Sequence, residues 1–218
     1  MNSEASQRVL LKDRAYEQLK QLILSEHYLE GDFLSERSLA EKLGMSKTPV
    51  RSAVERLEAE GFLMVSPQQG IVVRPFTLAE TNQAFDMRIA AESFAVRRLA
   101  GKLSEPQKEG LQASIKEQET YIEEVDIEAV IRTGTYFHLL ICSFLGNTEL
   151  MRITERQHER LRRSKRRLYQ GDYRKRVEQN CLEHKKLLDI MSSGDGERAA
   201  RFLEKHIEFS KRLLLLGQ

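Results

Sequence analysis

The stretch that decides the fold is Leu34–Val73, which reads LSERSLAEKLGMSKTPVRSAVERLEAEGFLMVSPQQGIVV. Ser35 predicts the N-terminus of a helix, because its hydroxyl can accept a hydrogen bond from a free backbone N–H group. That helix is expected to end at Gly44, which tolerates the left-handed backbone of a tight turn. Ser46 predicts the start of the next helix, and Pro49 lies in its first turn, where the missing N–H costs nothing. The stretch therefore predicts two short helices joined by a tight turn.

A predicted hairpin follows these helices, and a further helix is expected before them. Residues 63–66 and 71–73 are predicted to form two short strands around the turn PQQG. The earlier helix is expected near residues 12–27, where Ala15 and Leu19 lie on one apolar stripe. Three helices and a hairpin form a winged helix-turn-helix, which places its last helix in the major groove of DNA.

The outward side of residues 47–59 is the predicted DNA-reading surface, because Val50, Val54 and Leu57 are expected to face inward. The N-terminus of such a helix also offers free N–H groups to phosphate. The residues expected to contact DNA are Arg37, Ser46, Lys47, Thr48, Arg51, Gln69 and Gly70. The alternative is that they are ordinary solvated residues of a small three-helix domain.

The totals describe a chain of two modest domains. It has 218 residues, a net charge of +2 and two cysteines, and its N-terminus is polar. No apolar run approaches the roughly 20 residues of a membrane span, and two cysteines are too few for a disulfide scaffold, so a cytoplasmic protein with no membrane partner is expected. Residues 8–75 carry 10 Lys+Arg and 10 Asp+Glu, so attraction to DNA must come from where the basic residues lie.

The second domain, residues 76–218, is predicted to be an all-α bundle of six helices with short connections. The helices are expected near residues 77–103, 104–125, 126–144, 148–170, 173–191 and 196–216. The fold class is therefore mostly α: a winged helix-turn-helix over residues 8–75, followed by a six-helix bundle. The basic stretch 152–176 holds eleven Lys+Arg against three acids, and is interpreted as a solvated helix flank rather than a second nucleic-acid surface.

Three histidines lie on apolar faces of this predicted bundle: His138, His184 and His206. Converging neutral imidazoles can bind zinc, nickel or a similar metal, but lone histidines on apolar faces are more often hydrogen-bonded core residues. Arg88 lies on the inner stripe of the first bundle helix and needs an anionic partner. That partner is either Glu92, one helical turn away, or a bound carboxylate.

The chain resembles the GntR family of bacterial transcriptional regulators. The pattern LSE-R-x-LA-x-x-LG-x-S-x-TPVR-x-A-x-x-RL-x-x-EG, with a P-x-x-G wing, is matched nearly throughout residues 34–70. Lys47 stands where the family usually has arginine, which keeps the charge but loses the bidentate fork. Residues 77–213 resemble the FCD effector-binding domain of the FadR-type branch. The landmarks are Arg88 with Glu92, Phe137-His138, Gly146-Asn147, and the spacing from His184 to His206.

The resemblance implies a metal held by one aspartate and three histidines. His138, His184 and His206 fall at the histidine positions, but the aspartate position is Gly134. The expected cofactor is a divalent transition metal, zinc or nickel, on three histidines; the alternative is a metal-free pocket in which the histidines hold an anion. Asn180 could lend an oxygen, and Cys142 would have to ionise to act as a ligand.

The resemblance also implies a small carboxylate effector. The residues expected to bind it are Arg88, Glu92, Gln157 and Asn180, whereas His158 is expected to face solvent. The chain is thus predicted to be a ligand-responsive transcriptional regulator, and not an enzyme. It is expected to act as a repressor and to bind a palindromic DNA operator as a homodimer. A metal-dependent hydrolase is the rival interpretation, although no acid is placed as a general base. A structural nucleoid protein would have a basic DNA-binding domain. Residues 8–75 carry equal numbers of basic and acidic residues, which disfavours that interpretation.

Overall fold

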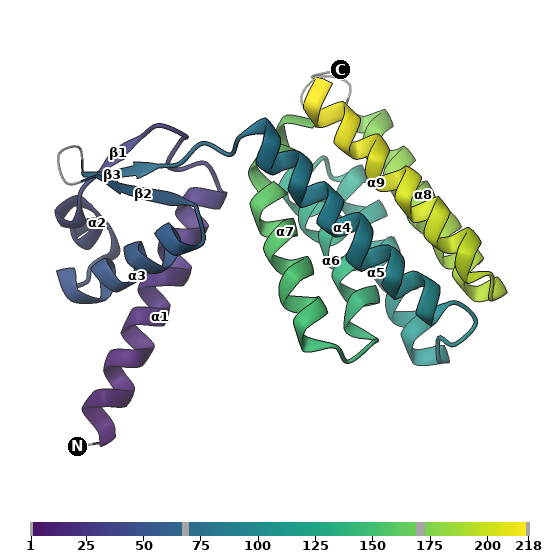
Figure 1. Cartoon of the computed structure of the whole chain (residues 1–218), viewed down its shortest axis with the longest axis horizontal. Helices are drawn as coiled ribbons and strands as arrows, with labels where there is room; N and C mark the ends of the chain where they lie inside the picture. The colour runs from purple at the N-terminus through teal and green to yellow at the C-terminus, as the bar shows by residue number, and fades with distance from the viewer. Residues whose placement is uncertain (1, 67–69, 169–172, 217–218) are drawn as a thin grey trace. The chain divides into compact units, whose positions relative to one another are not determined.

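The computed structural model describes residues 2–66, 70–168 and 173–216. The chain divides into two compact units, one ending at Thr77 and the other beginning at Leu78, and each is described by itself (Figure 1). The described residues form nine helices and three short strands, which confirms the mostly α fold. None of the helices in those described ranges is both long and apolar enough to cross a membrane.

Three helices and a small sheet make up the first unit. The helices are α1 (Asn2–Leu24), α2 (Glu36–Leu43) and α3 (Lys47–Ala59). The helices and the sheet share one core that includes Leu19, Leu39, Val50, Leu57 and Val73. The predicted boundaries of the first helix, residues 12–27, were wrong at both ends. Its chain leaves the helix after Leu24, and Glu26 takes a left-handed backbone with φ of 59°.

The sheet contains one strand more than predicted. It comprises β1 (Phe33–Leu34), β2 (Leu63–Ser66) and β3 (Gly70–Val73), all antiparallel in the order β1-β3-β2. In the hairpin, Met64 is opposite Val72 and Ser66 is opposite Gly70. Gly70 has φ of +81°, and a Cβ atom there would lie 3.1 Å from the carbonyl oxygen of Leu34. Close approach of β1 therefore requires glycine at the start of β3.

The helix-turn-helix follows the predicted caps closely. The hydroxyl of Ser35 accepts a hydrogen bond from the N–H of Ser38, and Gly44 ends α2 in the left-handed conformation with φ of 62°. Ser46 occupies the N-cap position of α3, but its side chain makes no capping hydrogen bond there, contrary to the prediction. The start of α3 was thus predicted correctly although the expected capping bond is missing.

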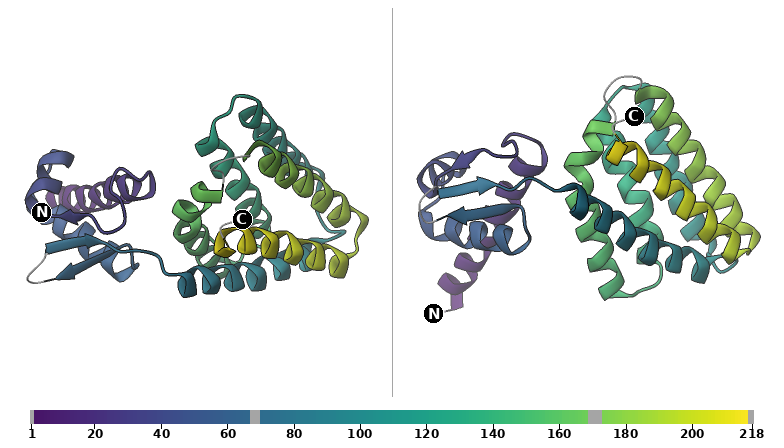
Figure 2. Two further views of the ribbon diagram at one scale, coloured as in Figure 1. Left: turned by 90° about the horizontal axis from the view of Figure 1, so that it is seen from above. Right: turned by 45° about the horizontal axis from the view of Figure 1, so that its top comes forward.

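The second unit is the predicted six-helix bundle. Its helices are α4 (Leu78–Leu99), α5 (Glu105–Glu123), α6 (Ile127–Ser143), α7 (Thr148–Leu168), α8 (Tyr173–Ser193) and α9 (Gly196–Leu216). Helix α4 packs along α9 and α7, and α5 packs along α6 and α8 (Figure 2). Phe85, Phe137, Leu161, Leu187 and Leu203 are among the fully buried side chains of this bundle. Five of these helices, all but α7, line the cavity described below.

Close packing at the start of α9 makes a testable demand on Gly196. A Cβ atom at this position would lie 2.7 Å from the carbonyl oxygen of Arg97, so the backbone would have to move. We expect Gly196→Ala to lower the free energy of unfolding by about 1–3 kcal/mol. Gly110→Ala is the matched control, because its Cβ would have ordinary contact, 3.8 Å from Leu140 Cδ2, and it removes a helix-interior glycine. Urea denaturation should show opposite signs for the two variants; equal effects would contradict the packing argument.

Candidate functional site

A cavity inside the bundle is the candidate ligand site. Its walls come from α4, α5, α6, α8 and α9, and its volume is about 40 Å³, room for an ion and a water molecule rather than a large ligand. The lining residues that bear on its chemistry are Arg88, Gln118, Gly134, His138, Asn180 and His206. Residues from separate parts of the chain therefore converge on one polar space in an otherwise apolar core.

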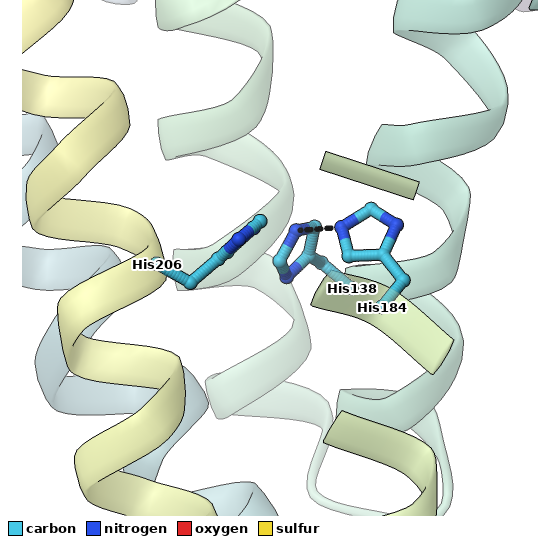
Figure 3. A group of neighbouring side chains, drawn as sticks. All are labelled: His138, His184 and His206. Atoms are coloured by element: carbon cyan, nitrogen blue, oxygen red, sulfur yellow. Dashed lines mark hydrogen bonds between the residues drawn. The ribbon is translucent and has the colours of Figure 1, made fainter. Parts of the chain in front are cut away.

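The three predicted histidines meet beside this cavity. His138 on α6, His184 on α8 and His206 on α9 are all buried and point toward one another (Figure 3). One ligand nitrogen from each lies within 4.8 Å of the others. The Nε2 atoms of His138 and His184 are 3.2 Å apart. The sequence thus predicted correctly which histidines come together.

Each histidine also has an oxygen beside its other ring nitrogen. Nδ1 of His184 lies 2.7 Å from Gln118 Oε1, and Nδ1 of His206 lies 2.6 Å from Glu183 Oε2. Nδ1 of His138 lies 2.8 Å from Glu92 Oε2, although the ring is not aligned for a hydrogen bond. These oxygens leave the Nε2 side of each ring for the centre of the cluster.

The donor set fits a divalent transition metal. Two imidazole nitrogens bound at about 2.0–2.1 Å to a tetrahedral ion lie roughly 3.3 Å apart, close to the observed spacing of His138 and His184. Burial is the main cause that lowers the pKa of His138, to about 4, so this ring is neutral near pH 7, as a metal ligand must be. The described residues bring only these three ligands together, so an ion here keeps positions open for another molecule.

Glu92 is a buried hub next to the histidines. Its carboxylate accepts hydrogen bonds from Arg88 at 2.8 and 3.4 Å and also lies 2.9 Å from Nε2 of His158. Burial alone would raise the pKa of this carboxyl, but the Arg88 guanidinium beside it holds the pKa well below its usual range. Arg88 is thus paired with the nearby acid, the first of the two partners considered. The prediction that His158 faces solvent was wrong, because its side chain is buried on α7.

The remaining predicted bundle residues differ in position. Asn180 lines the cavity, whereas Gln157 is buried on α7 and is not among the lining residues. A Cβ atom on Gly134 would lie 3.9 Å from both Gln118 Oε1 and His184 Cε1, so a side chain at this position starts at the edge of the cluster. Burial raises the pKa of Cys142 to about 12, so its thiol stays protonated and is a poor metal ligand.

The described residues of the predicted DNA-reading set lie on the first unit: Arg37 on α2, Ser46 to Thr48 and Arg51 at and within the start of α3, and Gly70 at the start of β3. Ser46, Lys47, Thr48 and Gly70 are exposed. Gln69 lies outside the described residues. Arg37 is exposed and donates a hydrogen bond to Glu41 at 3.0 Å.

Arg51 is also exposed, but a neighbouring acid holds its guanidinium. Two hydrogen bonds of 2.8 Å join the fork to the carboxylate of Glu36, on α2. These bonds are also the main cause that lowers the pKa of Glu36, so the acid is ionised when it holds the fork. The exposed guanidinium of Arg51 is therefore paired with an acid in the free chain.

Two family models match the chain. Residues 11–73 match the bacterial regulatory proteins of the gntR family, and residues 83–209, more than half of the chain, match the FCD domain. The chain is therefore a GntR-family regulator with an FCD domain. The family matches and the regulators that this chain resembles show that it is a transcriptional regulator and not an enzyme. The hydrolase interpretation is therefore ruled out.

Several known proteins are similar to most of the length of this chain. The uncharacterized regulator YdhC of Bacillus subtilis is 26% identical over 88% of this chain and 85% of its own length. The transcriptional repressor RspR of Escherichia coli is 24% identical over 82% of this chain and 77% of its own length. Among solved structures, E. coli McbR/YncC superposes with a TM-score of 0.82 at 24% identity, covering 95% of this chain and 98% of that one. This last likeness supports the fold.

Proposed function

We propose that this GntR regulator is a metal-dependent repressor that binds a palindromic operator as a homodimer and responds to a small organic acid. The observation that carries the proposal is the buried group of His138, His184 and His206, which opens on a cavity shared with Arg88. A neutral histidine set that binds a divalent cation attracts an anion to the open position.

The DNA half of the proposal rests on the exposed residues at the start of α3. Arg51 is exposed, and its planar fork, paired with Glu36 in the free chain, can exchange that carboxylate for the two acceptors of a guanine edge. Lys47, Ser46 and Thr48 lie nearby for phosphate contacts, and Gly70 with Gln69 belongs to the wing sequence. One such reader covers a short half-site, so a symmetric pair of chains reading a palindrome supplies the remaining specificity.

The sensing half assigns roles around the cavity. The three histidines hold zinc or nickel, and the ion supplies a Lewis-acid centre for a carboxylate of the effector. Asn180 lines the same cavity and offers a hydrogen bond to that acid. Arg88 attracts the acid electrostatically, although it is already paired with Glu92. Because the cavity is small, the carboxylate group enters it, and the bundle rearranges around the rest of the acid.

The direct test is DNA binding by the full chain with defined probes. Selection from a random duplex library, followed by fluorescence anisotropy, should return a palindrome bound by two chains. Zinc with citrate, acetate or lactate should then weaken binding to that duplex, whereas chelated protein should ignore the acids. Failure to select any symmetric duplex would overturn the operator proposal. Acids that act equally on chelated protein would overturn the metal-linked sensing.

Gly134→Asp is a gain-of-ligand test of this cavity. A Cβ atom has ordinary contact distances there, so an aspartate can be accommodated at the edge of the cluster. Adding a charged oxygen ligand to three neutral ones should tighten zinc binding by about tenfold or more, and the same carboxylate should compete with an added acid. Zinc affinity from a chromophoric chelator competition, with and without citrate, measures both effects. Gly134→Asn, which adds similar bulk without charge, is the control.

A further inference from the structure

Every ring in the histidine cluster is contacted on its outer nitrogen by an oxygen from another helix. Glu92 of α4 is beside His138 of α6, Gln118 of α5 is beside His184 of α8, and Glu183 of α8 is beside His206 of α9. Three independent pairs therefore place an acceptor on Nδ1.

The chemistry of these oxygens decides which ring nitrogen can be protonated when the two hydrogen-bond. An ionised carboxylate can only accept a hydrogen bond, so a ring nitrogen that bonds to Glu92 or Glu183 must carry the proton. Other donors already bind both carboxylates, because Glu92 accepts hydrogen bonds from Arg88 at 2.8 and 3.4 Å and Glu183 Oε1 accepts one from Gln179 at 2.9 Å. Gln118 is also fixed in orientation, since its Nε2 donates a hydrogen bond to the carbonyl oxygen of Ser114 at 3.3 Å and leaves Oε1 toward His184.

We propose that Glu92, Gln118 and Glu183 are positioning residues that set all three histidines as Nδ1–H tautomers when the site holds a metal ion. This inference rests on the metal-dependent function proposed above. Each neutral ring then turns its Nε2 lone pair to the centre of the cluster, which is the form that binds a metal ion. The three pairs together involve α4, α5, α6, α8 and α9. An ion bound by the three histidines would therefore link five helices of the bundle, directly or through the outer oxygens.

In the metal-free chain a hydrogen bond joins two of these rings. Nδ1 of His184 donates to Gln118 Oε1, so the proton of the 3.2 Å hydrogen bond between the two Nε2 atoms lies on His138. A metal ion bound there would take the place of that proton, and Nδ1 of His138 would then carry the proton of its ring. His138 is also the ring that sits out of line with its carboxylate, at 2.8 Å from Glu92 Oε2. It is therefore the ring expected to turn when the ion binds.

The side chains differ in a way that makes the inference testable. Gln118 shows that an amide oxygen is a sufficient acceptor here. Glu183→Gln should therefore keep His206 as the Nδ1–H tautomer, whereas Glu183→Leu removes the acceptor. Glu183 is partly exposed at 23% of its side chain, so the leucine variant can fold. Glu178→Leu, which removes an exposed acid of α8 that pairs with Arg174, is the matched control.

The first readout is the tautomer itself, measured in the metal-free full chain. Long-range ¹H–¹⁵N correlation spectra of histidine-labelled protein at pH 7.5 distinguish a protonated from an unprotonated ring nitrogen. We expect the Nδ1–H pattern for His184 and His206, although a neutral histidine in water favours Nε2–H, and the Nε2–H pattern for His138, whose Nε2 donates to His184. Only His206 should change, and only in Glu183→Leu. An Nε2–H pattern for His184 and His206 in the unmodified chain would overturn the inference, whether or not a metal binds.

The second readout is zinc affinity, measured by chelator competition on the same proteins. Loss of an outer partner typically costs about 10–100-fold in metal affinity. We expect that loss for Glu183→Leu and for Gln118→Leu, recovery to within about threefold for Glu183→Gln, and no change for Glu178→Leu. Unaltered affinity in both leucine variants contradicts the inference. Absence of zinc binding by the unmodified chain contradicts the proposed function instead, so the two failures are distinguishable.

Discussion

Replacement of His184 by alanine is expected to abolish zinc binding at micromolar metal. The change leaves His138 and His206 as ligands, one fewer than the three protein ligands of an open zinc site. It also removes the ring that contacts Gln118 Oε1 and the 3.2 Å hydrogen bond between the Nε2 atoms of His184 and His138. The loss should exceed the roughly 10–100-fold cost of removing an outer partner. Elemental mass spectrometry of untagged protein, together with chelator competition, measures it.

His27→Ala is the control for this experiment. That histidine is exposed in the first unit, so its removal should leave zinc content unchanged. Thermal denaturation separates ligand loss from misfolding. Zinc should raise the midpoint of the unmodified chain, because an ion that binds only the folded state stabilises it by mass action. The variant should fold without metal and show no such rise. Stoichiometric zinc in His184→Ala would remove this histidine from the ligand set.

Arg51→Ala should produce the largest loss of operator binding. A bidentate arginine–guanine contact contributes about 1–3 kcal/mol of discrimination. Two chains on two half-sites therefore lose about 2–6 kcal/mol, or roughly 30-fold to 20,000-fold in affinity. Fluorescence anisotropy on the selected duplex measures the loss. The same variant should bind an unrelated duplex almost as well as the unmodified chain does, because phosphate contacts dominate there.

Two further variants separate the role of the fork from that of the charge. Arg51→Lys keeps the charge but cannot form the planar bidentate contact, so it should lose nearly as much specificity as the alanine variant. Lys42→Ala removes an exposed positive charge of α2 outside the predicted contact set, and should cost little. If Arg51→Lys retained full affinity and specificity, Arg51 would be a phosphate contact rather than a base reader.

The helices and the histidine cluster could be predicted because their signals are local. Gly44 and the residues around it identify the turn of the helix-turn-helix, and the positions of His138, His184 and His206 on apolar faces indicate that they converge. The oxygens beside their Nδ1 atoms could not be found in this way. Each pair joins two helices whose rotation depends on packing, and an acid such as Glu183 resembles any surface acid in the sequence.

Helix α7 shows how such an error arises. Its apolar residues are sparse, so the sequence alone leaves open whether Ile153 or Thr154 lies on the buried face. The structure buries Thr154 and His158, while Ile153 stays 39% exposed. The face predicted to be buried was therefore slightly rotated from the one that is buried. For this reason His158, which contacts Glu92, was expected to face solvent. Strand β1 was missed for a different reason, because two residues carry no periodicity and pair only through the tertiary fold.

The ion pairs of the first unit affect how this regulator finds its target. Arg51 is held by Glu36 and Arg37 by Glu41, so much of the positive charge on the reading face is neutralised before DNA arrives. Random genomic DNA offers phosphates but few correctly placed guanines. Its contacts therefore compensate poorly for the loss of the ion pairs that the two arginines make with Glu36 and Glu41. The protein should consequently spend little time on the many competing non-specific sites, and should search mainly through free diffusion rather than by long sliding. Its residence on DNA is then concentrated at sequences that satisfy the arginine fork.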